Sequence, residues 1–187
     1  MLEISDQNLV MRTLTGETHA YSDLVQRYQG SVFNICYRLL GERREAEDLT
    51  QEAFIRAYQR LQTFDTQREF GPWMRRLTVN LCYNQLQKRR FEEMPLEEET
   101  TLNMWQIPRE TNQPEKVFLQ AERHSSLRAA LLELNTQYRV VIELRHFHDL
   151  SYEEISTELN LPINTVKSHI FRARKQLAQI LVNASET

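Results

Sequence analysis

The chain has 187 residues, of which 41 % are hydrophobic and 26 % charged, and its formal net charge is −3. This composition is that of one ordinary globular domain or two small ones, and it excludes disordered and collagen-like classes. No apolar run approaches the roughly 18 residues that span a bilayer, and the N-terminus lacks the basic start and apolar core of a signal peptide, so we expect a cytoplasmic protein without membrane insertion.

Only four glycines and five prolines are present, which favours an all-α fold, because strand-rich folds use these residues to turn. The charge is unevenly distributed: residues 1–93 and 113–187 are each neutral overall, whereas residues 94–112 carry a net charge of −3. This middle segment contains two prolines and no helical periodicity. The sequence therefore predicts two small helical domains joined by a linker, with Pro114 starting the next helix.

Apolar spacing predicts four helices in residues 1–93. The first starts with Thr18 as its cap, the second follows Gly30 and ends at Gly41, the third runs from about Glu45 to Leu61, and the fourth from about Glu69 to Arg90. Cys36 and Cys82 fall in the apolar pattern, which predicts buried free thiols rather than a disulfide.

Two of these helices carry opposite charges on their outward faces. Asp48, Gln51 and Glu52 share one face of the third helix, and segment 42–52 has a net charge of −3. Segment 68–90 has a net charge of +5 and mixes bases with aromatic and amide side chains, a combination that suits phosphates and unstacked bases. Two solvated faces with i,i+4 pairing remain an alternative, and Trp73 fits core packing equally well.

Residues 151–177 have the pattern of a helix-turn-helix. Ser151 and Glu154 form a capping box, residues 160–162 form the turn, and Asn164 is the expected cap of a second, basic helix. A basic second helix suits the major groove of DNA, although a hairpin that binds no DNA and a buried Phe171 remain alternatives. His146 and His148 do not share a helical face, and no nucleophile–base pair or phosphate loop is evident, so we expect no metal site, no cofactor and no enzymatic activity.

Three segments, in this order, resemble the extracytoplasmic-function group of bacterial RNA polymerase sigma factors in the sigma-70 family: EAEDLTQEAFIRAY (45–58), FGPWMRRLTVNLCYNQLQKRR (70–90) and LSYEEISTELNLPINTVKSHIFRARKQL (150–177). Members of this group keep sigma regions 2 and 4 joined by a linker. The resemblance implies region 2 in residues 1–93, region 4 in residues 113–187, and a role in promoter-specific transcription initiation during stress responses.

The resemblance also implies roles for individual residues. Asp48, Gln51 and Glu52 match the positions that dock on the clamp helices of core RNA polymerase, while region 4 meets the flap. The positions implied for recognition and melting of the −10 element are Phe64, Trp73, Arg76, Asn80, Lys88, Arg89 and Arg90. Those implied for the −35 element are Thr165, Lys167, Ser168, Phe171, Arg172 and Lys175. The expected partners are core polymerase, promoter DNA and an anti-sigma factor, with no small-molecule substrate.

The linker must let the two domains hold both promoter elements at once. A spacer of about 17 base pairs is roughly 58 Å long. Nineteen residues reach only about 29 Å as a helix but roughly 63–68 Å when extended. We therefore expect an extended linker. The resemblance implies that its acidic residues Glu97, Glu98 and Glu99 follow a basic polymerase channel, and a solvated hinge is the alternative. A helix-turn-helix regulator with an N-terminal dimerisation or sensing module is the alternative function, and it leaves the acidic docking face unexplained.

Overall fold

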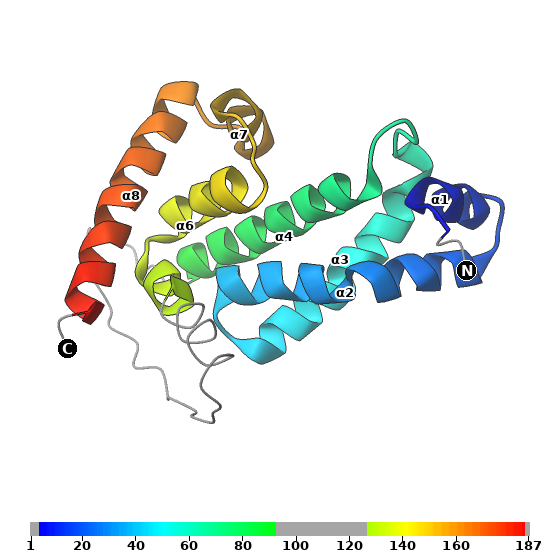
Figure 1. Cartoon of the computed structure of the whole chain (residues 1–187), viewed down its shortest axis with the longest axis horizontal. Coiled ribbons are helices and arrows are strands. Elements are labelled where there is room, and N and C mark those ends of the chain that lie inside the picture. The colour runs from blue at the N-terminus through cyan, green and yellow to red at the C-terminus, as the bar shows by residue number, and fades with distance from the viewer. Residues whose placement is uncertain (1–3, 93–126, 186–187) are drawn as a thin grey trace.

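The computed structural model describes residues 4–92 and 127–185, and every regular element in these ranges is helical (Figure 1). In chain order the elements are α1 (Asp6–Leu14), α2 (Thr18–Leu40), α3 (Arg43–Arg60), a 3₁₀ turn (Leu61–Thr63), α4 (Phe70–Glu92), α6 (Thr136–Ile142), a π-helical turn (Glu143–Phe147), α7 (Tyr152–Leu159) and α8 (Ile163–Ser185). Residues 127–133 are a further helical segment. The all-α prediction is confirmed. The predicted linker at 94–112 and the helix start at Pro114 lie outside the described residues.

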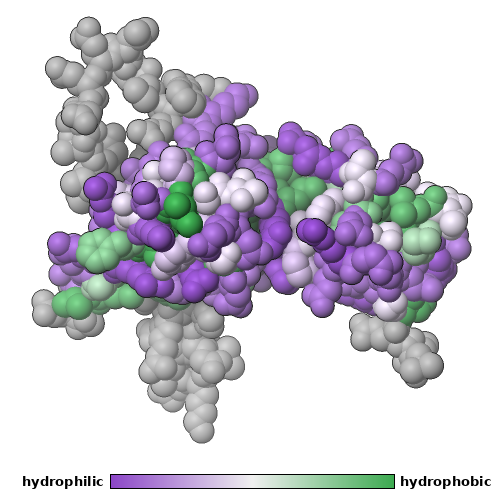
Figure 2. Space-filling view, turned by 90° about the horizontal axis from the view of Figure 1, so that it is seen from above, coloured by the Kyte–Doolittle hydropathy of each residue, from purple (hydrophilic) through white to green (hydrophobic). Residues whose placement is uncertain are grey.

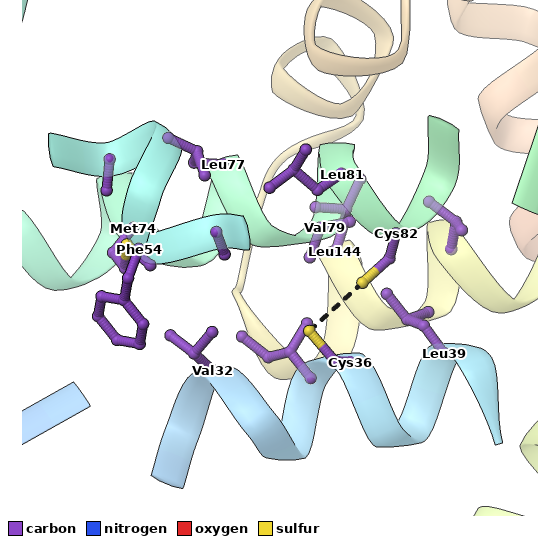
Figure 3. Close-up of a cluster of buried hydrophobic side chains, with 14 of the residues drawn as sticks. Val32, Cys36, Leu39, Phe54, Met74, Leu77, Val79, Leu81, Cys82 and Leu144 are labelled. Atoms are coloured by element: carbon purple, nitrogen blue, oxygen red, sulfur yellow. Dashed lines mark hydrogen bonds between the residues drawn. The ribbon is translucent and has the colours of Figure 1, made fainter. Parts of the chain in front are cut away.

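The first half of the chain is a bundle in which α2, α3 and α4 pack against one another, with α1 against α2 (Figure 1). Most of the periodic positions of the sequence are buried as expected, namely Leu24, Val32, Ile35, Leu39, Ala46, Ala53, Ala57, Leu61, Phe70, Leu77 and Leu81. Tyr21, Val25, Tyr28 and Leu49 belong to the same pattern and are half-buried against this core. Cys36 and Cys82 are free and buried, with their sulfur atoms 3.7 Å apart across α2 and α4 (Figure 3). No helix in the two described ranges combines the length and apolar character that a membrane crossing requires.

Several helix boundaries differ from the prediction. The two helices expected on either side of Gly30 are one continuous helix, α2, and the helix begins at Thr18 rather than after it. Gly30 faces open space, and its cost of about 1 kcal/mol relative to Ala is outweighed by burial of apolar residues on both sides of it. Helix α8 likewise begins at Ile163, one residue before the expected Asn164 cap. Helix α1 was not predicted.

The second half of the chain contains the predicted helix-turn-helix, formed by α7 and α8. Ile155, Leu159, Val166 and Ile170 are buried between the two helices and their neighbours. Helix α6 packs against α8 and supports it from behind. Figure 1 shows α8 at one end of the molecule and α1 at the other.

The two halves share one hydrophobic core. Val140, Val141 and Leu144 of the second half are buried in the same cluster as Cys36 and Cys82 of the first. Figure 3 shows Leu144 among the side chains that α2 and α4 contribute to this cluster. Helices α6 and α7 lie against α4, and α6 also contacts α2. The closed arrangement thus buries apolar surface from both predicted domains, which the sequence did not predict.

Two glycines allow a matched test of the backbone. Gly41 ends α2 with a φ of 83°, and a Cβ there would lie 2.8 Å from Leu132 Cδ2, whereas Gly30 is helical with nothing within 4 Å. Because L residues are strained in the left-handed region, Gly41→Ala should lower the free energy of unfolding by about 1–2 kcal/mol. Gly30→Ala should raise it by about 0.5–1 kcal/mol. Urea denaturation measures the unfolding free energies of both variants. A Gly41→Ala protein as stable as the original would contradict the strained left-handed backbone at position 41.

Candidate nucleic-acid and polymerase interfaces

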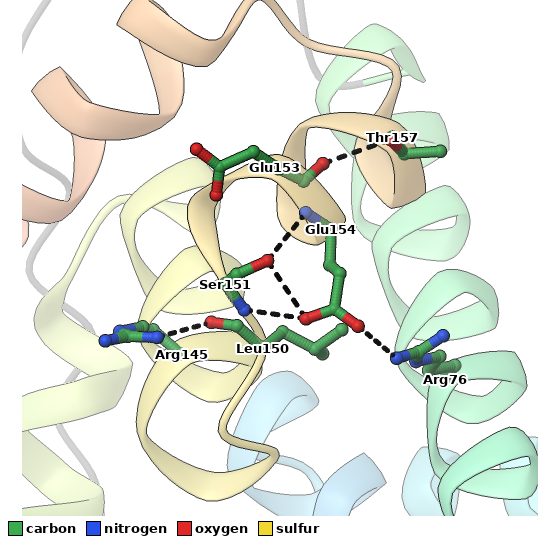
Figure 4. Close-up of polar contacts among 7 residues, drawn as sticks. All are labelled: Arg76, Arg145, Leu150, Ser151, Glu153, Glu154 and Thr157. Carbon is green, nitrogen blue, oxygen red and sulfur yellow. Dashed lines mark hydrogen bonds and ion pairs between the residues drawn. The ribbon is translucent and has the colours of Figure 1, made fainter.

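The helix-turn-helix is held in shape by local hydrogen bonds. The Ser151 hydroxyl accepts a hydrogen bond from the Glu154 backbone N–H at 3.2 Å, and the Glu154 carboxylate accepts one from the Ser151 backbone N–H at 2.9 Å (Figure 4). This reciprocal pair confirms the predicted capping box. Asn160 ends α7 in the left-handed conformation with a φ of 51°, which turns the chain toward Pro162 and α8. The angle between α7 and α8 therefore depends on a few local contacts.

The outward face of α8 presents most of the residues predicted to contact the −35 element. Phe171 is 71 % exposed, so the alternative in which it belongs to the core is wrong. The other exposed members of this face are Lys167, Ser168, Arg172 and Lys175, while Thr165 is half-buried. Three cations around an exposed aromatic ring form a surface suited to contact with a nucleic acid.

The residues predicted to dock on polymerase lie together on α3. Asp48 and Gln51 are exposed, and Glu52 is half-buried and paired with Arg56 at 2.5 Å. The same helical face continues with Ile55, which is 53 % exposed, and Tyr58. The prediction did not include these two residues, although the i, i+3, i+4 spacing from Asp48 extends to them. The face is therefore acidic at one end and apolar at the other.

The residues predicted to contact the −10 element fall into three groups along α4 and the loop that precedes it. Phe64 is buried and Trp73 half-buried, and their ring centroids lie 4.8 Å apart in a cluster with Phe70. Trp73 therefore packs on the core, as its alternative interpretation expected. This aromatic cluster anchors the loop that enters α4.

The second group, Arg76 and Asn80, faces the helix-turn-helix. Arg76 Nη2 lies 3.0 Å from Glu154 Oε1 (Figure 4). The Asn80 side-chain amide donates a hydrogen bond to the Glu158 carboxylate. Glu154 thus takes part in the capping box and in a contact between the two halves. Sequence reasoning placed these four residues in separate domains and did not predict that they meet.

The third group lies at the C-terminal end of α4. Arg89 forms an ion pair with Glu45 of α3, and Lys88 is exposed. Arg90 belongs to α4, but its side chain lies outside the described residues. Nine residues of helix separate Asn80 from Arg89, or about 14 Å along the axis. The predicted −10 surface is therefore an elongated strip rather than one compact site.

An ion pair between a partly exposed guanidinium and a buried carboxylate joins the two halves. Glu143 is 2 % exposed, and its carboxylate lies 2.6 Å from Arg38 Nη2 and 3.3 Å from His148 Nε2. The Arg38 guanidinium also lies over the Phe147 ring, 4.5 Å from its centroid. Burial raises the pKa of Glu143, but the neighbouring His148 and Arg38 lower it by more, so the pKa lies below that of an ordinary carboxyl.

Sequence reasoning missed this pair. The sequence feature that points to this pair is the carboxylate of Glu143 within the apolar run VVIEL (140–144). A buried carboxylate requires a partner, but residue spacing does not identify which one. His146, considered with His148 as a weak metal motif, instead lies 3.4 Å from Arg174 Nη2. Among the described residues, no group of three or more potential ligands could hold a metal ion.

The lowered pKa of Glu143 predicts a pH dependence. Because the native pKa lies below the unfolded value of about 4.3, the stability that the ionised Glu143 contributes is present above that value and is lost as pH falls through the native pKa. The difference in unfolding free energy between the original protein and Glu143→Gln should therefore fall between about pH 5 and pH 3. Urea titrations at several pH values measure it, and a pH-independent difference would show that the carboxylate is not ionised in the native state.

Comparisons with known proteins match both halves of this arrangement. Residues 24–92 match the family model for sigma-70 region 2, and residues 124–177 match that for sigma-70 region 4. The chain is 34 % identical over 185 residues to the ECF RNA polymerase sigma factor SigW of Bacillus subtilis, covering 96 % of this chain and 98 % of SigW.

Two solved structures share the fold. CnrH in complex with the cytosolic domain of CnrY has a TM-score of 0.59 at 24 % identity, over 96 % of this chain and 99 % of that one. The sigma factor RpoE in complex with the anti-sigma factor NepR from Bartonella quintana has a TM-score of 0.59 at 21 % identity, over 86 % and 96 %. With both sigma regions present in order and a relative matched along nearly its whole length, this chain belongs to the ECF RNA polymerase sigma factors.

Proposed function

We propose that this sigma factor docks on core RNA polymerase through the exposed face of α3, reads the −35 element with α8 and engages the −10 element with α4. In this assignment the chain acts by binding and positioning, without catalysing a reaction, and it does so in the cytoplasm. The observation that carries the proposal is the set of side chains on the outward face of α8, which follows a capped helix and a left-handed turn.

The side chains on the α8 face support two different kinds of DNA contact, one to phosphates and one to base edges. Cations on phosphates contribute affinity that does not depend on sequence, whereas a guanidinium can donate two hydrogen bonds to the edge of a guanine. We assign base reading to Arg172 and phosphate contact to Lys175. Both are exposed, whereas Val166 and Ile170 hold the opposite face of α8 in the core.

The α3 face supports the docking assignment. Asp48 and Gln51 project into solvent from an acidic segment, and Ile55 adds apolar area beside them. Interfaces commonly combine a desolvated apolar centre with charged groups at the rim. An N-terminal dimerisation or sensing module, the alternative function, is not supported, because the match to SigW includes this half of the chain.

We further propose an anti-sigma factor as a partner. CnrH was solved with the cytosolic domain of CnrY, and RpoE with the anti-sigma factor NepR. The division into region 2 in residues 1–93, an extended linker in residues 94–112 and region 4 in residues 113–187 belongs to the same proposal. It lets one chain reach two promoter elements roughly 58 Å apart.

Docking on polymerase can be tested by removing the α3 side chains. Gln51→Ala combined with Glu52→Ala should weaken binding to purified core polymerase by about 1–3 kcal/mol, the usual cost of losing charged or hydrogen-bonded contacts at an interface. Asp23→Ala combined with Gln26→Ala likewise removes one acidic and one amide side chain, at exposed positions of α2, and serves as the control. Equal core affinity of the two double variants in a titration would refute the α3 assignment.

Base reading by Arg172 and phosphate contact by Lys175 can be distinguished by varying the DNA sequence and the salt concentration. Arg172→Ala should cost about 1–3 kcal/mol and relax the preference at one base pair of the −35 element. Lys175→Ala should weaken all sequences alike and reduce the salt slope of binding by about one. Duplexes that vary the −35 element of a promoter transcribed by the holoenzyme are the probes, with Gln179→Ala as the exposed α8 control. If Arg172→Ala weakens every duplex equally, Arg172 does not read a base.

A further inference from the structure

The fold brings the two cysteines of this chain into direct contact. Cys36 of α2 and Cys82 of α4 are the only cysteines in the 187 residues, and both are buried as free thiols. The Cys82 thiol donates a hydrogen bond to Cys36 Sγ, and the two sulfur atoms lie 3.7 Å apart (Figure 3). The residues are 46 positions apart in the sequence, so tertiary packing pairs them.

The surroundings of the pair are those of a dithiol rather than of a metal centre. Apolar side chains of the core lie around the two sulfur atoms, Leu39 and Leu144 among them (Figure 3). In the ranges 4–92 and 127–185, no further His, Cys, Asp or Glu joins the two thiols to form a group that could hold a metal ion. The chemistry open to the pair is therefore that of two thiols with each other.

A disulfide between them requires a small movement. The sulfur atoms must approach from 3.7 Å to the bond length of about 2.05 Å. A rotation about the Cα–Cβ bond of either cysteine moves its sulfur without moving the backbone. Helices α2 and α4 already pack against each other, so the fold supplies the proximity that the bond needs.

The hydrogen bond makes the two thiols chemically different. Cys82 acts as the donor, and this lowers the pKa of Cys36 by more than burial raises it. The pKa of Cys82 is raised, because its proton is held by Cys36 and because the thiol is buried. A thiolate, not a thiol, is the nucleophile in sulfur chemistry. Cys36 is therefore the attacking sulfur of the pair, and Cys82 is the sulfur that completes the bond.

We propose that Cys36 and Cys82 form an oxidation site, which a two-electron oxidant such as hydrogen peroxide converts into a reversible disulfide between α2 and α4. The Cys36 thiolate attacks one peroxide oxygen and the O–O bond breaks, which gives a sulfenic acid and hydroxide. The hydroxide takes up the proton that Cys36 had released. The Cys82 sulfur then displaces the sulfenic oxygen, which leaves as water with the Cys82 proton. Two thiols and one peroxide thus give one disulfide and two waters.

Burial decides how fast the site reacts and which product it gives. Both thiols are inaccessible in the closed bundle, so the oxidant reaches Cys36 only during local opening, and the reaction is slow. When the bundle closes again, Cys82 lies against the sulfenic acid and reacts within the same molecule. The intramolecular disulfide is therefore favoured over further oxidation and over links between two chains.

The disulfide also constrains a functional part of the chain. It closes a loop from residue 36 to residue 82, which contains the whole of α3 with the face proposed to dock on polymerase. A link of this kind restricts the unfolded chain and so favours the folded bundle. In a reducing compartment it is a transient modification, formed under oxidant and removed by thiols.

The test oxidises the free full-length chain with hydrogen peroxide in native buffer. Mass spectrometry should show the loss of two hydrogen atoms, and a non-reduced protease digest should contain one peptide pair joined through Cys36 and Cys82. Circular dichroism should remain that of the helical protein. The oxidised chain should unfold at a higher urea concentration than the reduced chain, and dithiothreitol should restore both the lower midpoint and two titratable thiols.

Two single variants serve as matched controls for the roles of the two sulfur atoms. Cys82→Ser keeps a hydroxyl that can donate to Cys36 but cannot form the bond, so sulfenic acid should accumulate at Cys36 and be trapped by dimedone. Cys36→Ala leaves Cys82 alone, and burial raises the pKa of that thiol. It should give about tenfold less adduct at Cys82. Equal adducts in the two variants would overturn the assignment of Cys36 as the attacking sulfur.

Three results would overturn the site itself. Under peroxide, both thiols could remain titratable, or the product could be a sulfinic acid or a link between two chains. A disulfide that forms only in urea would show that the native fold does not bring the sulfur atoms together. An oxidised chain that unfolds at the same or a lower urea concentration than the reduced one would show that the bond does not fit between α2 and α4.

Discussion

The buried carboxylate of Glu143 is the constraint on which the closed arrangement depends. A charge taken out of water costs several kcal/mol, and here two hydrogen bonds from Arg38 offset that cost. Arg38 belongs to the opposite half of the chain, so Glu143 keeps these two hydrogen bonds only while the halves are in contact, whereas His148, 3.3 Å from its carboxylate, belongs to its own half. The ion pair therefore makes the closed form specific, and it makes separation costly unless water or another group takes the place of Arg38.

The apolar contacts act in the same direction. Val140, Val141 and Leu144 complete a core that already contains Cys36 and Cys82. Figure 3 shows Leu144 together with the two cysteines. Burial of this kind stabilises by roughly 25 cal/mol per Å² and has no preferred direction. The ion pairs of Arg38 and Arg76 require particular partners at particular distances, so they fix the orientation of the two halves, which the apolar contacts do not. Hydrophilic residues cover most of the face drawn in Figure 2, with hydrophobic residues in small separate patches.

Helix α4 connects the fold with the proposed function. Its inner face carries Met74 and Cys82 in the core, and the adjacent face carries Arg76 and Asn80, which contact α7. Any movement of α7 therefore changes which partners these two side chains have, while the core positions of α4 stay as they are.

The sequence by itself determined the helix-turn-helix, the family and most of the helices, because these depend on local spacing, capping and turn chemistry, but it missed α1 and the continuity of α2 through Gly30. Ser151 and Glu154 cap α7, and Asn160 ends it, from within ten residues of chain. The exposure of Phe171 and the packing of Trp73 were open in the sequence, since helical spacing suits either interpretation. Only the tertiary structure decided that Arg38 meets Glu143 and that α7 covers Arg76. Those contacts join residues 105 and 78 positions apart, and no local pattern encodes which distant charge a buried carboxylate will find.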